Sequence, residues 1–194
     1  MTATAAVVGL WVIFIVSWVV AAFWAGRTVA DFRMRAQLPL YTSALVAVLL
    51  LSIAQLMFPG LRVRLWEENA LFDWTMVTLC AIGLGWCWWA RIHLGNLWSA
   101  GVTRREGHRV IDTGPYSVVR HPMYTGSFLA MFAFAATRAR LGAWLMALLL
   151  AVIFSCKALL EERFLREELG ATYDAYRQRV PMFLPFFRRR PSRR

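Results

Sequence analysis

The chain alternates between long apolar runs and short polar segments. A helix needs about 20 apolar residues to cross a bilayer. Three runs have this length: residues 5–25, 38–58 and 71–92. Two further runs, 122–137 and 143–160, are separated by Arg138 and Arg140, which exclude one continuous span. We therefore predict an all-α integral membrane helical bundle with about five transmembrane helices, the last two forming a hairpin in which Pro122 takes an early helical position.

The pattern changes after residue 160. Charged residues alternate there with Phe, Leu and Tyr at helical spacing, which predicts an amphipathic helix. Gly170 is typical of the residue that follows a helix end, so we expect a second short helix after it. Val180-Pro181 then ends the helical pattern. Between residues 93 and 121 lies the longest polar segment, in which Gly114-Pro115 marks a turn and embedded apolar residues favour an ordered loop.

Composition supports the membrane class. The chain is 59% hydrophobic and 17% charged, whereas soluble domains average about 45–50% apolar and about 25% charged. Cys80, Cys87 and Cys156 all lie in apolar runs without metal-ligand spacing, so we expect no metal and no disulfide. The net charge of +11 lies in loops and tails beside lipid headgroups, and no basic-aromatic module points to nucleic acid.

The distribution of the 22 Lys and Arg residues predicts an orientation. With five spans and the N-terminus outside, most of these residues face the cytoplasm. The polar segment 93–121 and the chain from Glu161 onward then lie together on the cytoplasmic side, with the C-terminus. No internal repeat is evident, which weakens a transporter hypothesis.

These two polar segments carry the candidate chemistry. Arg and His pair with carboxylates, and Glu accepts hydrogen bonds from vicinal hydroxyls, as an anionic, ribose-bearing ligand requires. Aromatic faces attract a sulfonium. The candidates are His108, Arg109, Tyr116, Arg120, His121, Tyr124, Lys157, Glu161 and Glu162.

Structural roles remain open for several of them. Arg120 could anchor the interface, His121 could cap a helix, and Glu161-Glu162 could be an acidic first helical turn. Lys157 could form an ion pair with Glu161 four residues later, or it could face a substrate.

Two motifs in order, R-H-P-x-Y-x-G at 120–126 and E-E-x-x-L-x-x-x-x-G-x-x-Y-x-x-Y at 161–176, resemble the isoprenylcysteine carboxyl methyltransferase family. The similarity runs from about residue 93 to 185 and includes L-G-N-x-W-S at 94–99. It implies one membrane methyltransferase domain over 1–194, with two N-terminal spans in 1–60, a catalytic core in 71–185 and a basic tail in 186–194.

The resemblance also implies S-adenosylmethionine as the methyl donor, with S-adenosylhomocysteine as product, in a cytoplasmic pocket. Lys157 takes the place of a family Arg associated with the substrate carboxylate, and Lys lacks the bidentate fork of Arg. The implied catalytic residues are Lys157, Arg120 and Glu162, and the implied substrate contacts are Lys157, Asn96 and Trp98. The implied cofactor-binding residues are His108, Arg109, Val110, Ile111, Tyr116, His121, Pro122, Met123, Tyr124 and Glu161.

The favoured function is methyl transfer to the carboxylate of an isoprenylcysteine-like or other isoprenoid-bearing molecule. A carboxylate is ionised at neutral pH and needs no general base, so Lys157 or Arg120 would orient it. The alternative enzyme is a phospholipid or other lipid amine N-methyltransferase, in which Glu162 or His121 would be a candidate base. The non-enzyme alternative is a membrane binding or transport protein.

Overall fold

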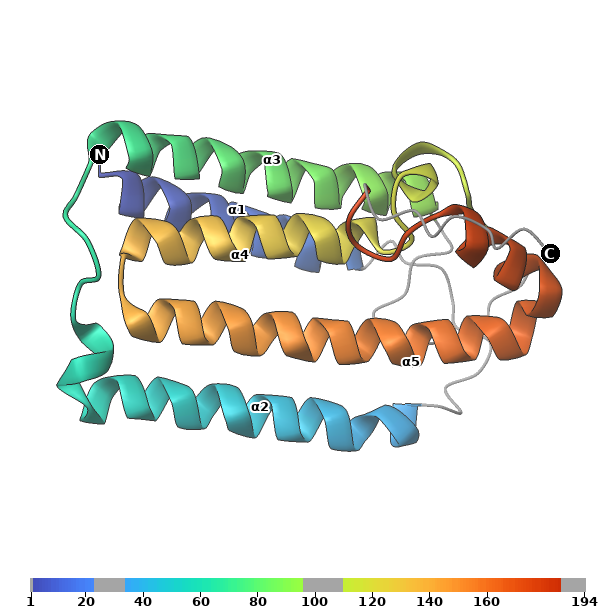
Figure 1. The fold of residues 1–194 in the computed structure, drawn as a ribbon, viewed down its shortest axis with the longest axis horizontal. Coiled ribbons are helices and arrows are strands. Elements are labelled where there is room, and N and C mark those ends of the chain that lie inside the picture. The colour runs from blue at the N-terminus through green and yellow to red at the C-terminus, as the bar shows by residue number, and fades with distance from the viewer. Residues whose placement is uncertain (1, 23–33, 96–109, 186–194) are drawn as a thin grey trace, which may run out of the picture.

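The computed structural model describes residues 2–22, 34–95 and 110–185, and these residues form a helical bundle (Figure 1). No strand occurs in those ranges, apart from an isolated bridge between Arg64 and Arg140. The all-α prediction is therefore confirmed. The helices are α1 (Ala3–Ala22), α2 (Met34–Met57), α3 (Ala70–Leu94), α4 (Pro122–Arg138) and α5 (Leu141–Arg179), with short 3-10 helices η1 (Pro59–Arg62) and η3 (Gly114–Ser117).

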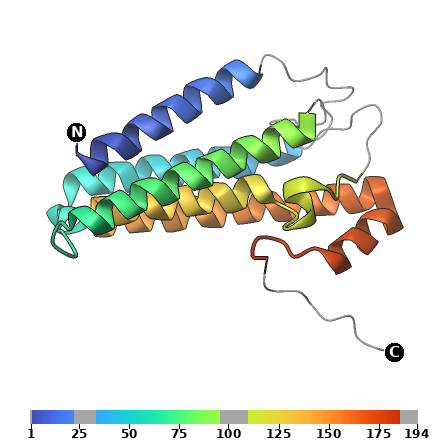
Figure 2. The same cartoon turned by 90° about the horizontal axis from the view of Figure 1, so that it is seen from above.

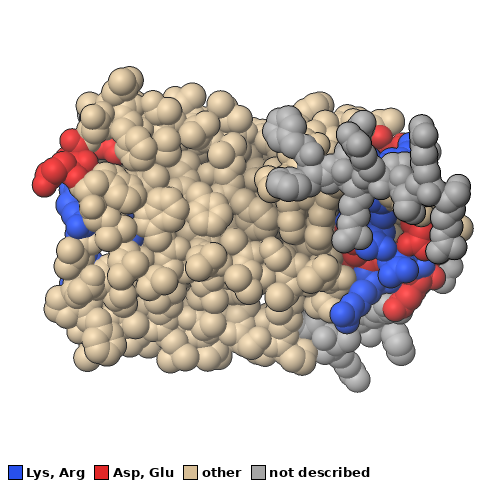
Figure 3. All heavy atoms as spheres, in the orientation of Figure 1, with Lys and Arg blue, Asp and Glu red and all other residues tan. Residues whose placement is uncertain are grey.

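Helices α1, α2, α3 and α5 are each long and apolar enough to cross a membrane. Helix α4 has 17 residues, the short hairpin arm that the sequence predicts, and it packs between α3 and α5. On the face seen in Figure 3, Lys, Arg, Asp and Glu lie at the two ends of the bundle, and the band between them is uncharged. This distribution fits a bundle whose middle lies in hydrocarbon, because charged side chains are costly there.

The hairpin between α4 and α5 is tight. Ala139 takes a left-handed conformation (φ 48°), and its N–H bonds to the carbonyls of Ala135 and Ala136, both at 3.1 Å. Its own carbonyl accepts from the N–H of Leu65 at 2.7 Å, which ties the hairpin to the segment before α3. Helix α5 then continues through residue 160 without a break, because no Gly or Pro interrupts its hydrogen-bond ladder there.

Helix α5 breaks where the sequence predicts. Gly170 leaves helical geometry with φ 53° and ψ −129°, and the chain then turns back as a short helix ending at Arg179. Figure 2 shows this short helix folded back beside the end of the long one. The turn brings Tyr173 and Tyr176 into a buried cluster with Val180.

Helix α1 packs on α3 and α4 (Figure 2). Trp88 of α3 donates its indole N–H to the Ser17 hydroxyl of α1 at 3.2 Å. Its ring meets Trp18 edge-on, with the centroids 5.6 Å apart. Ser17, a polar residue within the first apolar run, therefore forms a contact between α1 and α3.

Small residues set the closest helix contact, between α3 and α4. A Cβ atom at Gly83 would lie 2.6 Å from the carbonyl oxygen of Gly126. A Cβ at Gly126 would lie 2.7 Å from Cys87 Sγ. In membranes, where lipid is as apolar as the side chains, such close backbone approach is a main source of helix association. The pair aligns the start of α4, and with it the motif at 120–126, against α3.

We predict that Gly83→Ala destabilises the protein by about 1–3 kcal/mol, because the new methyl group meets backbone atoms that must shift. Gly85→Ala on the same helix is the control, since nothing lies within 4 Å of its Cβ position. Thermal unfolding in detergent measures both variants. Equal melting temperatures for the two would contradict the assigned α3–α4 contact.

Candidate active site

The segment after α5 docks on the first turn of α4. The N–H of Arg120 donates to the Pro181 carbonyl at 2.8 Å, and the N–H of His121 to the Met182 carbonyl at 3.1 Å. The Thr125 hydroxyl donates to the Phe183 carbonyl at 2.9 Å. Both sequence motifs are thereby held together at one end of the bundle.

The Glu162 carboxylate lies at the centre of this end and is 4% exposed. Arg120 Nε donates to its Oε1 at 2.6 Å, and Arg177 Nε donates to its Oε2 at 3.0 Å. His121 Nε2 lies 3.3 Å from Oε1. Arg120 Nη1 donates to the carbonyls of Arg177 (3.1 Å) and Val180 (2.6 Å). A buried charge needs such partners.

Burial by itself would raise the pKa of Glu162, but the hydrogen bonds and charges of His121 and Arg120 lower it to about 2. The carboxylate is therefore ionised at neutral pH and is a weak base. Its oxygens face Arg120, His121 and Arg177 and not the cavity described below. Glu162 thus contacts Arg120 and His121 directly, and its role in catalysis stays a prediction.

His121 is the N-cap residue that precedes α4, and its side chain makes no capping hydrogen bond. Its ring stacks on Tyr124, with centroids 5.6 Å apart and planes 20° apart. Its Nδ1 lies 3.7 Å from Glu161 Oε2, while Nε2 faces Glu162. The imidazole therefore lies between the two neighbouring carboxylates.

Glu161 points into the cavity beside Lys157. Its Oε1 accepts the Tyr124 hydroxyl at 2.7 Å and lies 3.9 Å from Lys157 Nζ. The Lys157 ammonium also lies 5.8 Å from the ring centroid of Tyr41 and 5.9 Å from that of Tyr124, within cation–π range. The carboxylate side chain is 24% exposed, so it can accept further hydrogen bonds from a ligand.

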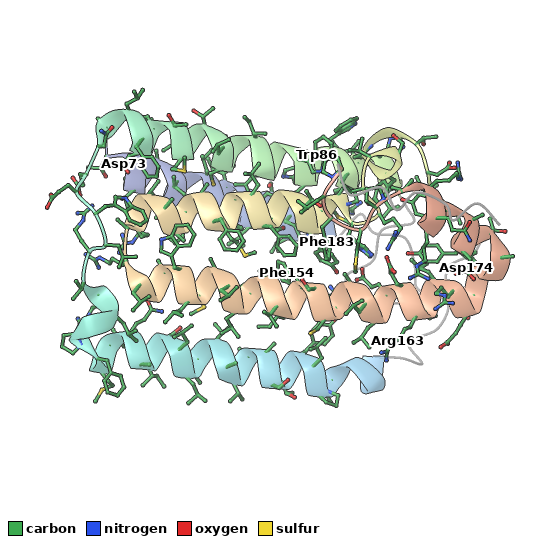
Figure 4. All side chains as sticks on the ribbon, viewed as in Figure 1. Asp73, Trp86, Phe154, Arg163, Asp174 and Phe183 are labelled. Atoms are coloured by element: carbon green, nitrogen blue, oxygen red, sulfur yellow. The ribbon has the colours of Figure 1, made fainter. Side chains whose placement is uncertain are left out.

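A single cavity of about 1170 Å³ begins at these residues and continues along the bundle. Residues spaced three or four apart line it on α4, which is the spacing of one helical face. The same spacing occurs on α1 and α5. Beyond the first turn, the lining residues on α4 are Tyr124, Ser127, Met131, Phe134 and Arg138; those on α5 include Ala143, Ala147, Leu150, Phe154 (labelled in Figure 4), Lys157 and Glu161.

Most of the residues predicted from the sequence lie on the cavity wall: Val110, Ile111, Tyr116, Arg120, His121, Pro122, Met123, Tyr124, Lys157 and Glu161. Glu162 lies behind the wall. His108, Arg109, Asn96 and Trp98 lie outside the described residues.

Sequence reasoning missed two contributions to the site. One is Tyr41 of α2, whose ring lies beside Lys157; no local sequence signal marks it. The other is the long apolar wall, in which one face of α1 takes part through residues such as Trp11, Ile15 and Trp18. The sequence does contain a pattern for this wall, because its apolar residues recur at helical spacing. The same pattern occurs in helices that only pack against other helices, so it does not indicate a cavity.

The chain matches the isoprenylcysteine carboxyl methyltransferase family over residues 76–170. It is 31% identical to protein-S-isoprenylcysteine O-methyltransferase B of Arabidopsis thaliana, over 75% of this chain and 74% of that protein. It is 33% identical to methanethiol S-methyltransferase 2 of Bradyrhizobium diazoefficiens, over 79% of this chain and 62% of that protein. A cobalt-zinc-cadmium resistance protein of Cupriavidus metallidurans is 28% identical, over 60% of this chain and 55% of that protein.

The fold and the site thus define a class: an integral membrane enzyme that transfers methyl groups. The chain belongs to the isoprenylcysteine carboxyl methyltransferase family. The family resemblance of the motifs is therefore confirmed. The named acceptors of its relatives differ, from an isoprenylcysteine to methanethiol, so family membership does not by itself specify the acceptor.

We predict that Glu162→Gln lowers stability by about 2–4 kcal/mol at neutral pH, because it removes a buried charge and leaves its cationic partners uncompensated. The pKa of Glu162 is lowered from 4.5 to about 2 by folding, so its contribution is present above pH 4.5 and is lost as pH falls towards 2. The gap in melting temperature between wild type and variant should close over that range.

Glu68→Gln is the matched control. Glu68 also pairs with an arginine, Arg64, but both side chains are exposed. Exposed pairs contribute about 0–1 kcal/mol, so this variant should melt close to wild type. A Glu162→Gln variant that melts like Glu68→Gln at pH 7 would contradict the central role of Glu162.

Proposed function

We propose that this enzyme transfers the methyl group of S-adenosylmethionine to a lipophilic acceptor, with the carboxylate of an isoprenylcysteine-like or other isoprenoid-bearing molecule favoured. The observation that carries the proposal is the single cavity, which joins a polar end at Lys157 and Glu161 to an apolar chamber between the helices. Its volume of about 1170 Å³ exceeds the roughly 300–1,000 Å³ of most single-ligand pockets. There is room for a donor and an acceptor together.

The polar end fits the donor. Glu161 has free acceptor capacity for ribose hydroxyls or an ammonium group, since its partners occupy only part of a carboxylate that is 24% exposed. Val110, Ile111, Tyr116 and the wall from His121 to Tyr124 offer the apolar and aromatic surface that an adenine needs. Arg109 and His108 complete the set by family resemblance. The bound donor would supply an electrophilic methyl group on sulfur.

The apolar chamber fits the acceptor's tail. Residues of α1 that line it, such as Val12 and Ile15, are 53% and 54% exposed, so they are not covered by another helix. This side of the chamber therefore borders the lipid, and a lipophilic molecule could enter sideways while its head reaches Lys157. The N-terminal spans supply walls of the chamber, which supports one catalytic domain over 1–194.

Lys157 would orient the acceptor carboxylate, and Tyr41 and Tyr124 would hold its ammonium in place. An acceptor carboxylate oxygen would form the new bond to the methyl carbon while the donor's carbon–sulfur bond breaks and its electron pair stays on sulfur. No proton moves in this step, so no base is needed. Arg120 lines the same end, while Glu162 positions Arg120 and His121. Asn96 and Trp98 remain candidate substrate contacts by resemblance.

We also propose that the polar end of the cavity faces the cytoplasm and the N-terminus the outside. The excess of Lys and Arg in the segments at that end supports this orientation. Protease digestion of a C-terminal tag in inverted membrane vesicles measures it. A tag that is cut only in right-side-out vesicles would reverse the assignment.

For the donor, we predict that Glu161→Ala and His121→Ala each weaken S-adenosylhomocysteine binding at least about tenfold, because each loses a polar contact of the site. Calorimetry of the purified protein in detergent measures the affinity. Glu168→Ala on the same helix is the control, since Glu168 is exposed and away from the cavity. If wild type binds no S-adenosylhomocysteine, the proposed donor is wrong.

For the acceptor, we predict that Lys157→Ala lowers kcat/KM about 10- to 100-fold for a prenylcysteine analogue and leaves S-adenosylhomocysteine affinity within a few-fold of wild type. Lys157→Arg should recover most of the activity, since Arg also pairs with carboxylates. Labelled S-adenosylmethionine is supplied with the prenylcysteine analogue or with phosphatidylethanolamine. If only the phospholipid becomes labelled, the acceptor group is an amine and not a carboxylate.

A further inference from the structure

The cavity has a second polar end that the proposed reaction does not use. Between Tyr124 and Arg138, the α4 residues on its wall are Ser127, Met131 and Phe134. Arg138 is the last of this stripe of α4 residues, and Gln55 of α2 also lines the cavity, close to Gly142 at the start of α5. Fourteen residues of helix separate the two ends of the stripe, about 21 Å at 1.5 Å per residue. The chamber is thus apolar along its length and polar at both ends.

Arg138 is the charged residue of the chamber's far end, and no hydrogen bond or ion pair joins its side chain to another described residue. It belongs to the last turn of α4, next to the hairpin at Ala139, so it lies at the level where the chain leaves the hydrocarbon. A guanidinium that lines an apolar cavity is costly unless an anion pairs with it. Its fork suits oxygen anions, phosphate among them.

The acceptor of the proposed function does not account for this charge, because the far end of an isoprenoid is hydrocarbon. A membrane phospholipid does. Its phosphate lies at the depth of the hairpin, and its acyl chain reaches about 15 Å inward, half of the roughly 30 Å hydrocarbon core. That reach is shorter than the chamber, so the polar end at Lys157 stays free. The exposed α1 side gives the acyl chain a way in.

We propose that Arg138, with Gln55, forms a phospholipid site in which Arg138 pairs with the phosphate and one acyl chain lies along Met131 and Phe134 in the chamber. The Gln55 side chain lies close to Gly142, where a Cβ atom would be 2.6 Å from its Oε1. The site is distinct from the methyl-transfer end, and its acyl chain would share the apolar chamber with the tail of a lipophilic acceptor.

The test uses the full chain, delipidated in a neutral detergent, with native mass spectrometry to count bound lipids. The probes are dioleoyl-phosphatidylglycerol, dioleoylglycerol with the same chains but no phosphate, and inorganic phosphate alone. We expect Arg138→Gln to weaken phosphatidylglycerol binding about tenfold, the effect of one charged hydrogen-bonding pair. Arg138→Lys should lose less, since Lys keeps the charge without the fork.

Arg62→Gln is the matched control. Arg62 lies at the same end of the bundle, is exposed, and donates to the Leu56 carbonyl outside the cavity. Its loss should leave phosphatidylglycerol affinity unchanged. The melting temperature of each variant shows whether weaker lipid binding results from unfolding. If Arg138→Gln does not fold, Arg138→Lys provides the test.

Three results would overturn the site. Equal weakening in Arg62→Gln and Arg138→Gln would mean general attraction to a basic surface. Equal affinity for dioleoylglycerol and phosphatidylglycerol would show that the site does not recognise the phosphate. Inorganic phosphate that binds as tightly as phosphatidylglycerol would show that the acyl chain contributes nothing to binding.

Discussion

A buried carboxylate must have its charge compensated inside the protein, and the end of the bundle that holds the candidate active site is arranged around that requirement. Glu162 receives Arg120 and His121 from the start of α4 and Arg177 from the helix that returns after Gly170. Three segments far apart in the chain therefore have to meet at one point. Because Glu161 precedes Glu162 on the same helix, its carboxylate is placed at the cavity with Tyr124 and Lys157. The ion-pair cluster and the ligand-facing wall are two sides of the same helical turn.

The rest of the bundle serves to place this turn against a chamber. Gly83 and Gly126 let α3 and α4 approach closely, which fixes the start of α4. The tight hairpin at Ala139 returns the chain beside α4 as α5, and α1 covers the chamber from another side. Polar residues at both ends and apolar residues between them suit ligands that have a polar head and a long tail. The fold thus provides one cavity with a polar end and an apolar chamber.

Much of the fold could be predicted from the sequence, because apolar run length and the position of Gly and Pro act locally. The helices, the hairpin at Arg138 and Arg140 and the break at Gly170 all follow from such signals. The sequence pattern changes at residue 160, but helix α5 continues through that position. The alternation of polar and apolar residues shows which face of a helix is buried, and it does not show where the backbone hydrogen bonds end. The hydrogen bond from the Trp88 indole to the Ser17 hydroxyl joins two helices, and no local pattern predicts it.

By itself, the sequence determined the class, the membrane setting and the two motifs that form the polar end, because each depends on residue type and spacing within one segment. The tertiary structure decided which of two adjacent glutamates faces the cavity, since the direction of a side chain depends on what packs beside its helix. It also decided that Tyr41 lies next to Lys157 and that Arg138 lines the far end of the chamber. Those contacts join helices whose relation no local pattern encodes, because helix packing sums many weak contacts over the whole bundle.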